Sequence, residues 1–123
     1  MNAANGTVFS HTTSANIGIV SFSSIPTTSA NCKTFTVLVT QGAIGYNTTA
    51  ATGIGTQLAT IVTDTNVAIS THIKVGSGTT ITLTSAPGSL DILTFIVSYN
   101  GVGIASTNFT IVGFAATDFR GVI

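Results

Sequence analysis

The chain has 123 residues, of which only six are charged (three basic, three acidic), and it contains no Glu. About a quarter of the residues of a soluble domain are usually charged; here 24 Thr and 12 Ser supply the polarity instead. Three scattered cations, Lys33, Lys74 and Arg120, cannot form the basic surface that nucleic-acid binding or electrostatic attachment to a membrane requires. The composition therefore predicts neither kind of partner.

The β-branched residues Thr, Val and Ile pack well on a pleated sheet and lose side-chain freedom in helices, so their abundance predicts an all-β fold. The mean hydropathy is +0.60, yet no stretch approaches the ~18 consecutive apolar residues of a membrane-spanning helix. Residues 1–6 lack the basic and apolar regions of a secretory signal. We therefore expect synthesis in a cytoplasm and transport elsewhere only as part of an assembly.

The first half of the chain predicts two strands. After an N-terminal arm of about residues 1–8, residues 17–23 have a strand pattern that ends at Ile25-Pro26. Residues 33–40 alternate in period two, with Phe35, Val37 and Val39 on one face. Residues 42–57 are rich in Gly, Thr and Ala and predict a long loop or an irregular edge.

The second half contains a denser series of strand patterns. Residues 58–63, 67–75 and 79–84 predict three short strands, separated by turns at Asp64-Thr65-Asn66 and at Gly76-Ser77-Gly78. Residues 91–99 form the longest pattern and are apolar on both faces, which is typical of a central strand.

Asn100-Gly101 is a strong signal for a tight hairpin, because both residues tolerate the positive φ of a type I′ turn. It predicts a turn from Tyr99 into a strand that begins near Val102. Residues 109–112 predict the last strand, followed by an apolar C-terminal tail of about residues 115–123. Such a tail is expected to dock on its own domain or on a neighbour. The predicted assembly residues of this region are Phe114, Phe119, Val122 and Ile123.

Seven to eight short strands with no helix between them predict one antiparallel β-sandwich over residues 1–123, Ig-like or jelly-roll-like in its connections.

Catalytic and metal-binding patterns are weak. His11 and His72 lie far apart in sequence, and the lone Cys32 can form neither an intrachain disulfide nor a Cys-rich metal site. No Gly-x-Ser-x-Gly elbow is present. We therefore expect no enzyme, no metal and no cofactor. A hydrolase would need a cleft that gathers His11 or His72 with an aspartate.

The loops offer a candidate contact surface. Tyr46 is an aromatic residue in the Gly-rich loop 42–57 and precedes Asn47, while Asn100 and Gly101 begin the loop 100–108. These residues would carry the contacts if the chain bound a receptor or a host surface glycan.

The edges of a sandwich point to assembly. Natural proteins protect edge strands with Lys, Pro, inward charges or bulges, and this chain has only two Lys and two Pro. Surfaces buried in obligate contacts are poor in Lys, Glu and Asp. The scarcity of charge therefore predicts a homo-oligomer, or a subunit of a larger particle.

A resemblance to a known family supports that view. It rests on VFSHT at residues 8–12, VSFSSIPTT at 20–28 and VTQGAIGY at 39–46. These stretches resemble, in the same order, modules of virion proteins of tailed bacteriophages, especially marine and cyanobacterial phages. Those modules have a VFSH-type start, an F-x-x-[IV]-P-T-T turn and a [VT]-x-Q-G-A-x-x-Y loop. The resemblance covers about a third of the chain and brings no catalytic residues.

The resemblance implies a structural protein of the virion exterior, such as a capsid-decoration, tail or fibre component that contacts other virion proteins. The alternative is a receptor- or carbohydrate-binding module at a fibre tip.

Overall fold

The computed structural model describes residues 1–17, 20–46, 54, 58–78 and 80–121. Its strands are β1 (Val8–Thr12), β2 (Ser21–Ile25), β3 (Asn31–Thr40), β4 (Leu58–Thr63), β5 (Ala68–Val75), β6 (Leu90–Tyr99) and β7 (Phe109–Phe119). Three single turns of 3₁₀ helix are Ala3–Asn5, Gly76–Gly78 and Ser106–Asn108. The all-β fold predicted from the sequence is confirmed.

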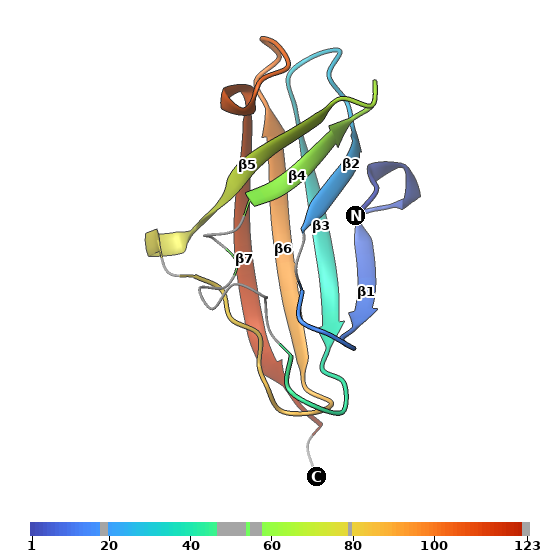
Figure 1. The fold of residues 1–123 in the computed structure, drawn as a ribbon, viewed down its shortest axis with the longest axis vertical. Coiled ribbons are helices and arrows are strands. Elements are labelled where there is room, and N and C mark those ends of the chain that lie inside the picture. The colour runs from blue at the N-terminus through green and yellow to red at the C-terminus, as the bar shows by residue number, and fades with distance from the viewer. Residues whose placement is uncertain (18–19, 47–53, 55–57, 79, 122–123) are drawn as a thin grey trace.

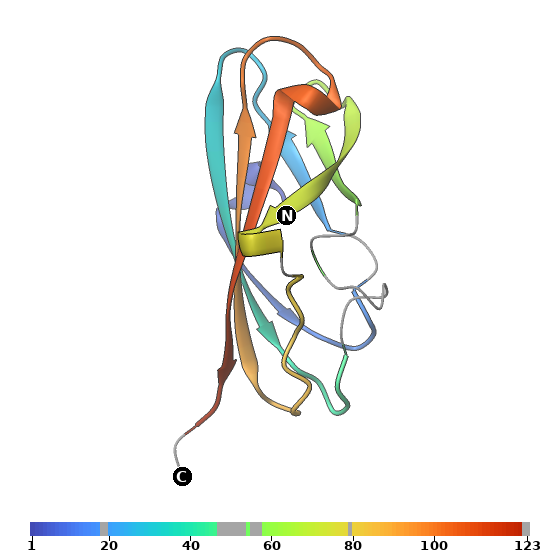
Figure 2. The same cartoon turned by 90° about the vertical axis from the view of Figure 1, so that its left-hand side faces the viewer.

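The seven strands form one sheet in the order β1-β3-β6-β7-β5-β4-β2, which curls into two facing layers (Figures 1 and 2). We call β1, β3, β6 and β7 the large layer, and β2, β4 and β5 the small layer. Strand β5 belongs to both, because residues 68–72 pair with β4 and residues 73–75 pair with β7. This architecture is a broad form of the expected sandwich.

The pairing is mixed, not purely antiparallel as expected. Strands β3–β6, β4–β5 and β6–β7 are antiparallel, whereas β1–β3, β2–β4 and β5–β7 are parallel. Alternation of apolar and polar residues predicts a strand but not its partner. The parallel pairs between distant segments could therefore not be predicted from the sequence.

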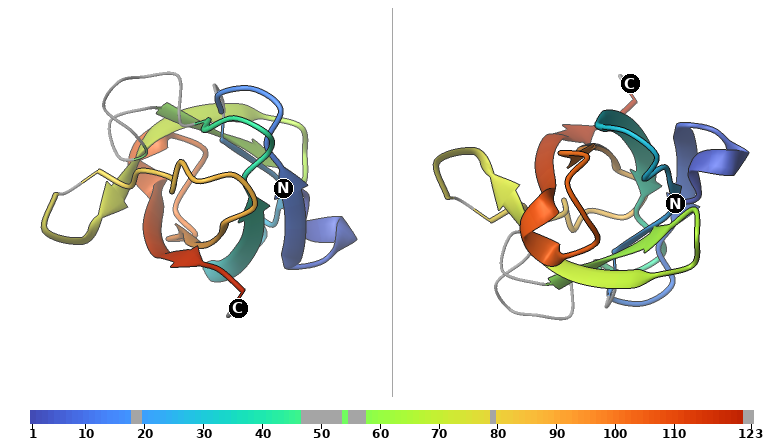
Figure 3. Two further views of the ribbon diagram at one scale, coloured as in Figure 1. Left: turned by 90° about the horizontal axis from the view of Figure 1, so that it is seen from below. Right: turned by 90° about the horizontal axis from the view of Figure 1, so that it is seen from above.

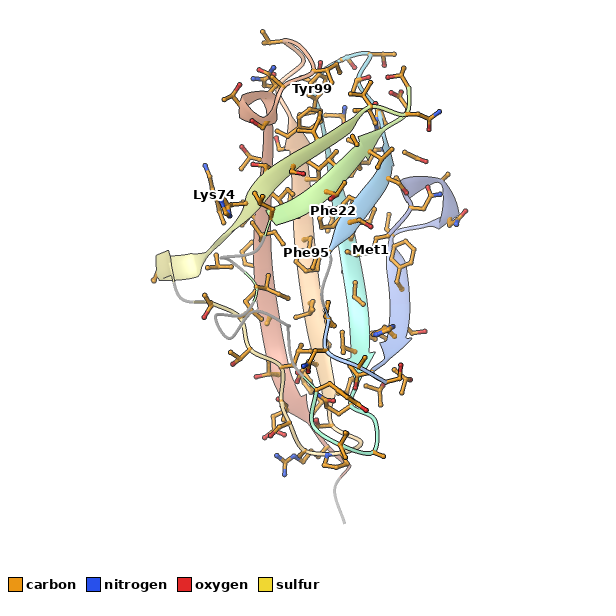
Figure 4. The ribbon with its side chains drawn as sticks, in the orientation of Figure 1. Met1, Phe22, Lys74, Phe95 and Tyr99 are labelled. Carbon is orange, nitrogen blue, oxygen red and sulfur yellow. The ribbon has the colours of Figure 1, made fainter. Side chains whose placement is uncertain are left out.

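Apolar side chains fill the space between the layers. The ring of Phe22 on β2 lies 5.1 Å from that of Phe35 on β3 and 5.3 Å from that of Phe95 on β6. Phe22 and Phe95 lie close to one another in Figure 4. Ile61 of β4 and Ile111 of β7 are also fully buried. The core is therefore built from the inward residues that the period-two patterns predict.

The N-terminal segment connects the two layers. The backbone N–H of Ser23 on β2 donates to the carbonyl of Met1 at 2.8 Å, and the Met1 amino group donates to the carbonyl of Ser21. Burial lowers the pKa of that amino group from its ordinary value. Seven residues after Met1 the chain enters β1, which pairs with β3 (Figure 3). Residues 1–12, expected as an arm up to about residue 8, thus run from one edge of the curled sheet to the other.

Two local predictions were wrong. Residues 80–84 form no regular strand; Ile81 makes a single bridge with Ile54, and the amide of Thr84 donates to the carboxylate of Asp91 instead of to a strand. The tight turn expected at Asn100-Gly101 is the start of a longer loop. Strands β6 and β7 do form a hairpin, but the side-chain Oδ1 of Asn100 accepts the amide of Val102 at 3.0 Å and draws the chain outward.

Candidate functional site

The register-paired outward residues of β1, β3, β6 and β7 include no charged side chain. Alternate residues of each strand point outward, and the pairing registers align them in rows such as Val8–Thr36–Thr94–Phe114. The outward residues are Val8, Ser10, Thr12, Cys32, Thr34, Thr36, Leu38, Thr40, Leu90, Ile92, Thr94, Ile96, Ser98, Thr110, Val112, Phe114 and Ala116. This face is a mixture of Thr and Ser with aliphatic and aromatic residues.

The charged residues lie elsewhere. Lys74 is exposed on the outer side of β5 (Figure 4) with His72 on the same side of that strand. Asp64 is at the exposed tip of the β4–β5 hairpin, and Asp91 is buried. Asp118 and Arg120 form an exposed ion pair near the end of β7. Lys74 is level with Val112, so this cation borders the outer face of the large layer at β7, while the paired outward residues of β1, β3, β6 and β7 are themselves uncharged.

Tyr46 is held in place through its backbone. The side chain of Gln41, which is 3% exposed, accepts the amide of Tyr46 at 3.1 Å and donates to the carbonyl of the same residue. The hydroxyl of Thr13 donates to Gln41 at 2.7 Å and accepts the amide of Gly42 at 2.9 Å. The Gln-Gly-Ala-x-x-Tyr pattern is thus explained by the conformation of residues 41–46, and the Tyr46 ring is half-buried.

Gly42 leaves no room for a side chain, because a Cβ there would overlap the carbonyl oxygen of Thr13. We expect Gly42→Ala to lower the free energy of unfolding by about 2 kcal/mol, since the backbone must shift away from Thr13. Gly76→Ala is the matched control: a Cβ at position 76 meets no atom within 4 Å, and its effect should stay within about 0.5 kcal/mol. Urea titration of both variants measures the difference, and equal midpoints would contradict this account.

Asn100 and Gly101 lie at the other end of the molecule. Gly101 adopts φ 83° and lies against Ala30, whereas Tyr46 follows the opposite end of β3. The ten residues of β6 separate the two ends by about 30 Å. The predicted contact residues therefore do not form one surface, and Asn47 lies outside the described residues.

The predicted assembly tail is mostly strand. Phe114 and Phe119 are 49% and 46% exposed, and residues 115–119 continue β7 beside β6. Val122 and Ile123 lie outside the described residues. Sequence patterns identified the apolar character of this segment but not its place at an edge of the large layer.

A hollow of about 320 Å³ lies between the layers beneath β1, with walls that include Phe9, Val37 and Leu93. The described lining contains His11 but neither a carboxylate side chain nor a cysteine. Both histidines are exposed, and neither makes a hydrogen bond to an aspartate in the described part of the chain. The described residues also contain no group of three His, Cys, Asp or Glu side chains placed to hold a metal ion.

In the described ranges, no helix has the length and apolar character needed to cross a membrane. Comparison of the chain with protein-family models, with curated proteins and with solved structures found no match. A functional conclusion must therefore come from the chain's own surfaces.

Proposed function

We propose that this chain is a structural subunit on the exterior of a tailed-phage virion, a capsid-decoration, tail or fibre component that acts by protein–protein contact. The observation that carries the proposal is the lack of charge among the register-paired outward residues of the large layer. Protein contacts are depleted of Lys, Glu and Asp at their centres. A face without charge can be covered without leaving a buried, unpaired ion.

The dimensions of this face suit an interface. Strands lie about 4.8 Å apart and rise about 3.3 Å per residue, so the four strands of the large layer present a projected area on the order of 500–600 Å². A standard interface buries about 800 Å² per partner. The face is therefore close in size to one side of a specific contact, and its Thr and Ser hydroxyls keep it hydrated before assembly.

The phage-like stretches support the virion setting. VFSHT coincides with β1, VSFSSIPTT contains β2, and VTQGAIGY follows the end of β3 into the loop that Gln41 holds. The resemblance therefore covers three segments with defined structural roles, although none of them carries chemistry.

The test is incorporation into the particle. Thr94 lies in the middle row of the face, on a central strand. Thr94→Glu should reduce the amount of the chain in gradient-purified particles at least about tenfold, because it places a charge in a contact that tolerates none. Ser70→Glu, on the exposed outer side of β5, is the matched control and should be incorporated like wild type. Mass spectrometry measures the amounts.

Equal incorporation of the two variants would overturn the role of the face. Absence of the wild-type chain from purified particles would overturn the proposed function itself.

One observation favours the alternative, a receptor- or glycan-binding module at a fibre tip. Val102 is 80% exposed and Ile104 43% exposed in the loop 100–108, and Val67 is 42% exposed at the β4–β5 turn. Clustered loops at one end of a sandwich are a common binding site. Glycan-array binding that Val102→Ser removes would favour this reading, and binding that Tyr46→Ala removes would instead locate the contact at the opposite end.

A further inference from the structure

The lower half of the large layer has two free edges. Within the described residues, β1 (Val8–Thr12) pairs only with β3, and the part of β7 from Phe114 to Phe119 pairs only with β6. Strand β5 leaves β7 after Val75. Unpaired strand edges present rows of backbone N–H and C=O groups that can pair with another strand.

The two edges match in level, length and direction. The registers connect Val8 to Thr36, Thr94 and Phe114, and they connect Thr12 to Thr40, Leu90 and Phe119. Strand β1 is parallel to β3, and both β3 and β7 are antiparallel to β6. Strands β1 and β7 therefore run in the same direction. A second copy moved sideways by the width of the layer would bring its β1 beside this β7 as a parallel pair.

The hydrogen bonds between β1 and β3 show which backbone N–H and C=O groups of β1 point away from β3. The amide of Thr36 donates to the carbonyl of Thr7, and the amide of Thr13 donates to the carbonyl of Thr40. Every second residue of a parallel strand bonds to a given neighbour. The odd-numbered residues of β1 therefore bond to β3, and the backbone groups of Val8, Ser10 and Thr12 point to the free edge.

Neither edge carries a Lys or a Pro, although lower β7 has a bulge at Asp118, next to the exposed Asp118–Arg120 ion pair. Lys33 lies on the upper part of β3, beyond the end of β1, and Lys74 lies on β5 where it covers upper β7. A hollow of about 330 Å³ separates lower β7 at Phe114 from residues 75–76 and 81–82.

Small side chains meet at one level where the two edges would join. The row of Ser10, Leu38, Ile92 and Ala116 places two small outward side chains next to each other.

We propose that copies of this chain join edge to edge, with β1 of one copy against Phe114–Phe119 of β7 in the next. The inference rests on the proposed function, for which it supplies a partner: a second copy of this chain. The contact uses two different patches, so it is head-to-tail and produces a closed ring or an open row of subunits, not a two-fold dimer. The large layers of neighbouring copies then form one continuous sheet.

Sedimentation velocity of the purified chain over a wide concentration range gives the first test. The wild-type chain should associate, and Ser10→Pro should weaken association about tenfold or more, because it deletes an outward N–H and leaves the β1–β3 ladder intact. Circular dichroism checks that the variant is folded. Ser70→Glu is the control: it lies on the exposed outer side of β5 and on neither edge, and its association should equal that of wild type. Association lost in Ser70→Glu but kept in Ser10→Pro would overturn the edge contact.

Disulfide trapping tests the pairing independently. In a Cys32→Ser background, Ser10→Cys with Ala116→Cys should give a ladder of covalent multimers under mild oxidation, since side chains on neighbouring strands lie within disulfide reach. Either cysteine alone should give none. A covalent dimer from Ser10→Cys alone would indicate β1–β1 pairing and overturn the proposal, as would a chain that stays monomeric. Either result leaves the proposed function standing if the chain is found in purified particles.

Discussion

Phe22→Ala should lower the free energy of unfolding by about 4 kcal/mol, the largest single effect that we expect in this chain. Phe22 is fully buried, and its ring touches Phe35 and Phe95 of the opposite layer. Truncation removes the transfer free energy of the ring and leaves a cavity that the two layers cannot fully close. A domain of this size has a total stability of only about 5–15 kcal/mol, so much of it would be lost.

Phe119→Ala is the matched control, because it removes the same ring from a position that is 46% exposed. Its effect should remain within about 1 kcal/mol. Chemical denaturation followed by circular dichroism measures both variants. Similar losses for the two would mean that Phe22 does not join the layers as described.

Asp91→Ala should cost about 3 kcal/mol. The Asp91 side chain is 1% exposed; its Oδ2 accepts the amide of Thr84 at 2.7 Å and its Oδ1 accepts the amide of Asp118 at 2.9 Å. Asp118 has φ 66° within a bulge of β7, so β6 cannot satisfy its amide in the regular ladder. Hydrogen bonds to a charged acceptor contribute about 1.5–3 kcal/mol each, and deletion leaves two donors unpaired.

Asp64→Ala provides the comparison for Asp91→Ala. Asp64 is an exposed acid whose side chain accepts the hydroxyl of Thr27 at 2.9 Å. Its loss should cost less than about 1 kcal/mol. Thermal unfolding of both variants at one pH decides the matter: if Asp91→Ala is as stable as Asp64→Ala, the carboxylate does not anchor the bulge.

The sequence predicted the strands wherever alternation and burial agree. Residues 58–63 match β4, and residues 91–99 match all but the first residue of β6, whose inward residues are buried throughout. It missed β1, because Phe9 is the one apolar residue that this exposed strand directs to the core. Residues 79–84 alternate like a strand, yet the side chain of Asp91, seven residues farther on, binds the amide of Thr84. Strand propensity does not predict that a side chain will bind a backbone amide in place of a neighbouring strand.

The sequence predicted the composition of the candidate surface but not which residues form it. The scarcity of charge predicted a surface with few charged residues, and Ile92 and Ile96 showed that one strand is apolar on both sides. Which outward residues share a face depends on the registers of β1, β3, β6 and β7, which are set by pairing between distant segments. Tyr46 and Asn100, predicted as contact residues of two loops, lie at opposite ends of β3 and β6 for the same reason.

The parallel pairing of β1 with β3 also has a mechanical consequence. A pull transmitted into β1 along the chain acts parallel to the strand, so the five residue pairs from Val8 to Thr12 are loaded in shear and together. A strand pulled across a ladder would instead lose its hydrogen bonds one after another. Resistance to such a pull depends on the rate of unfolding and not on the equilibrium free energy, so even a short β1 can act as a clamp that holds the domain closed under tension.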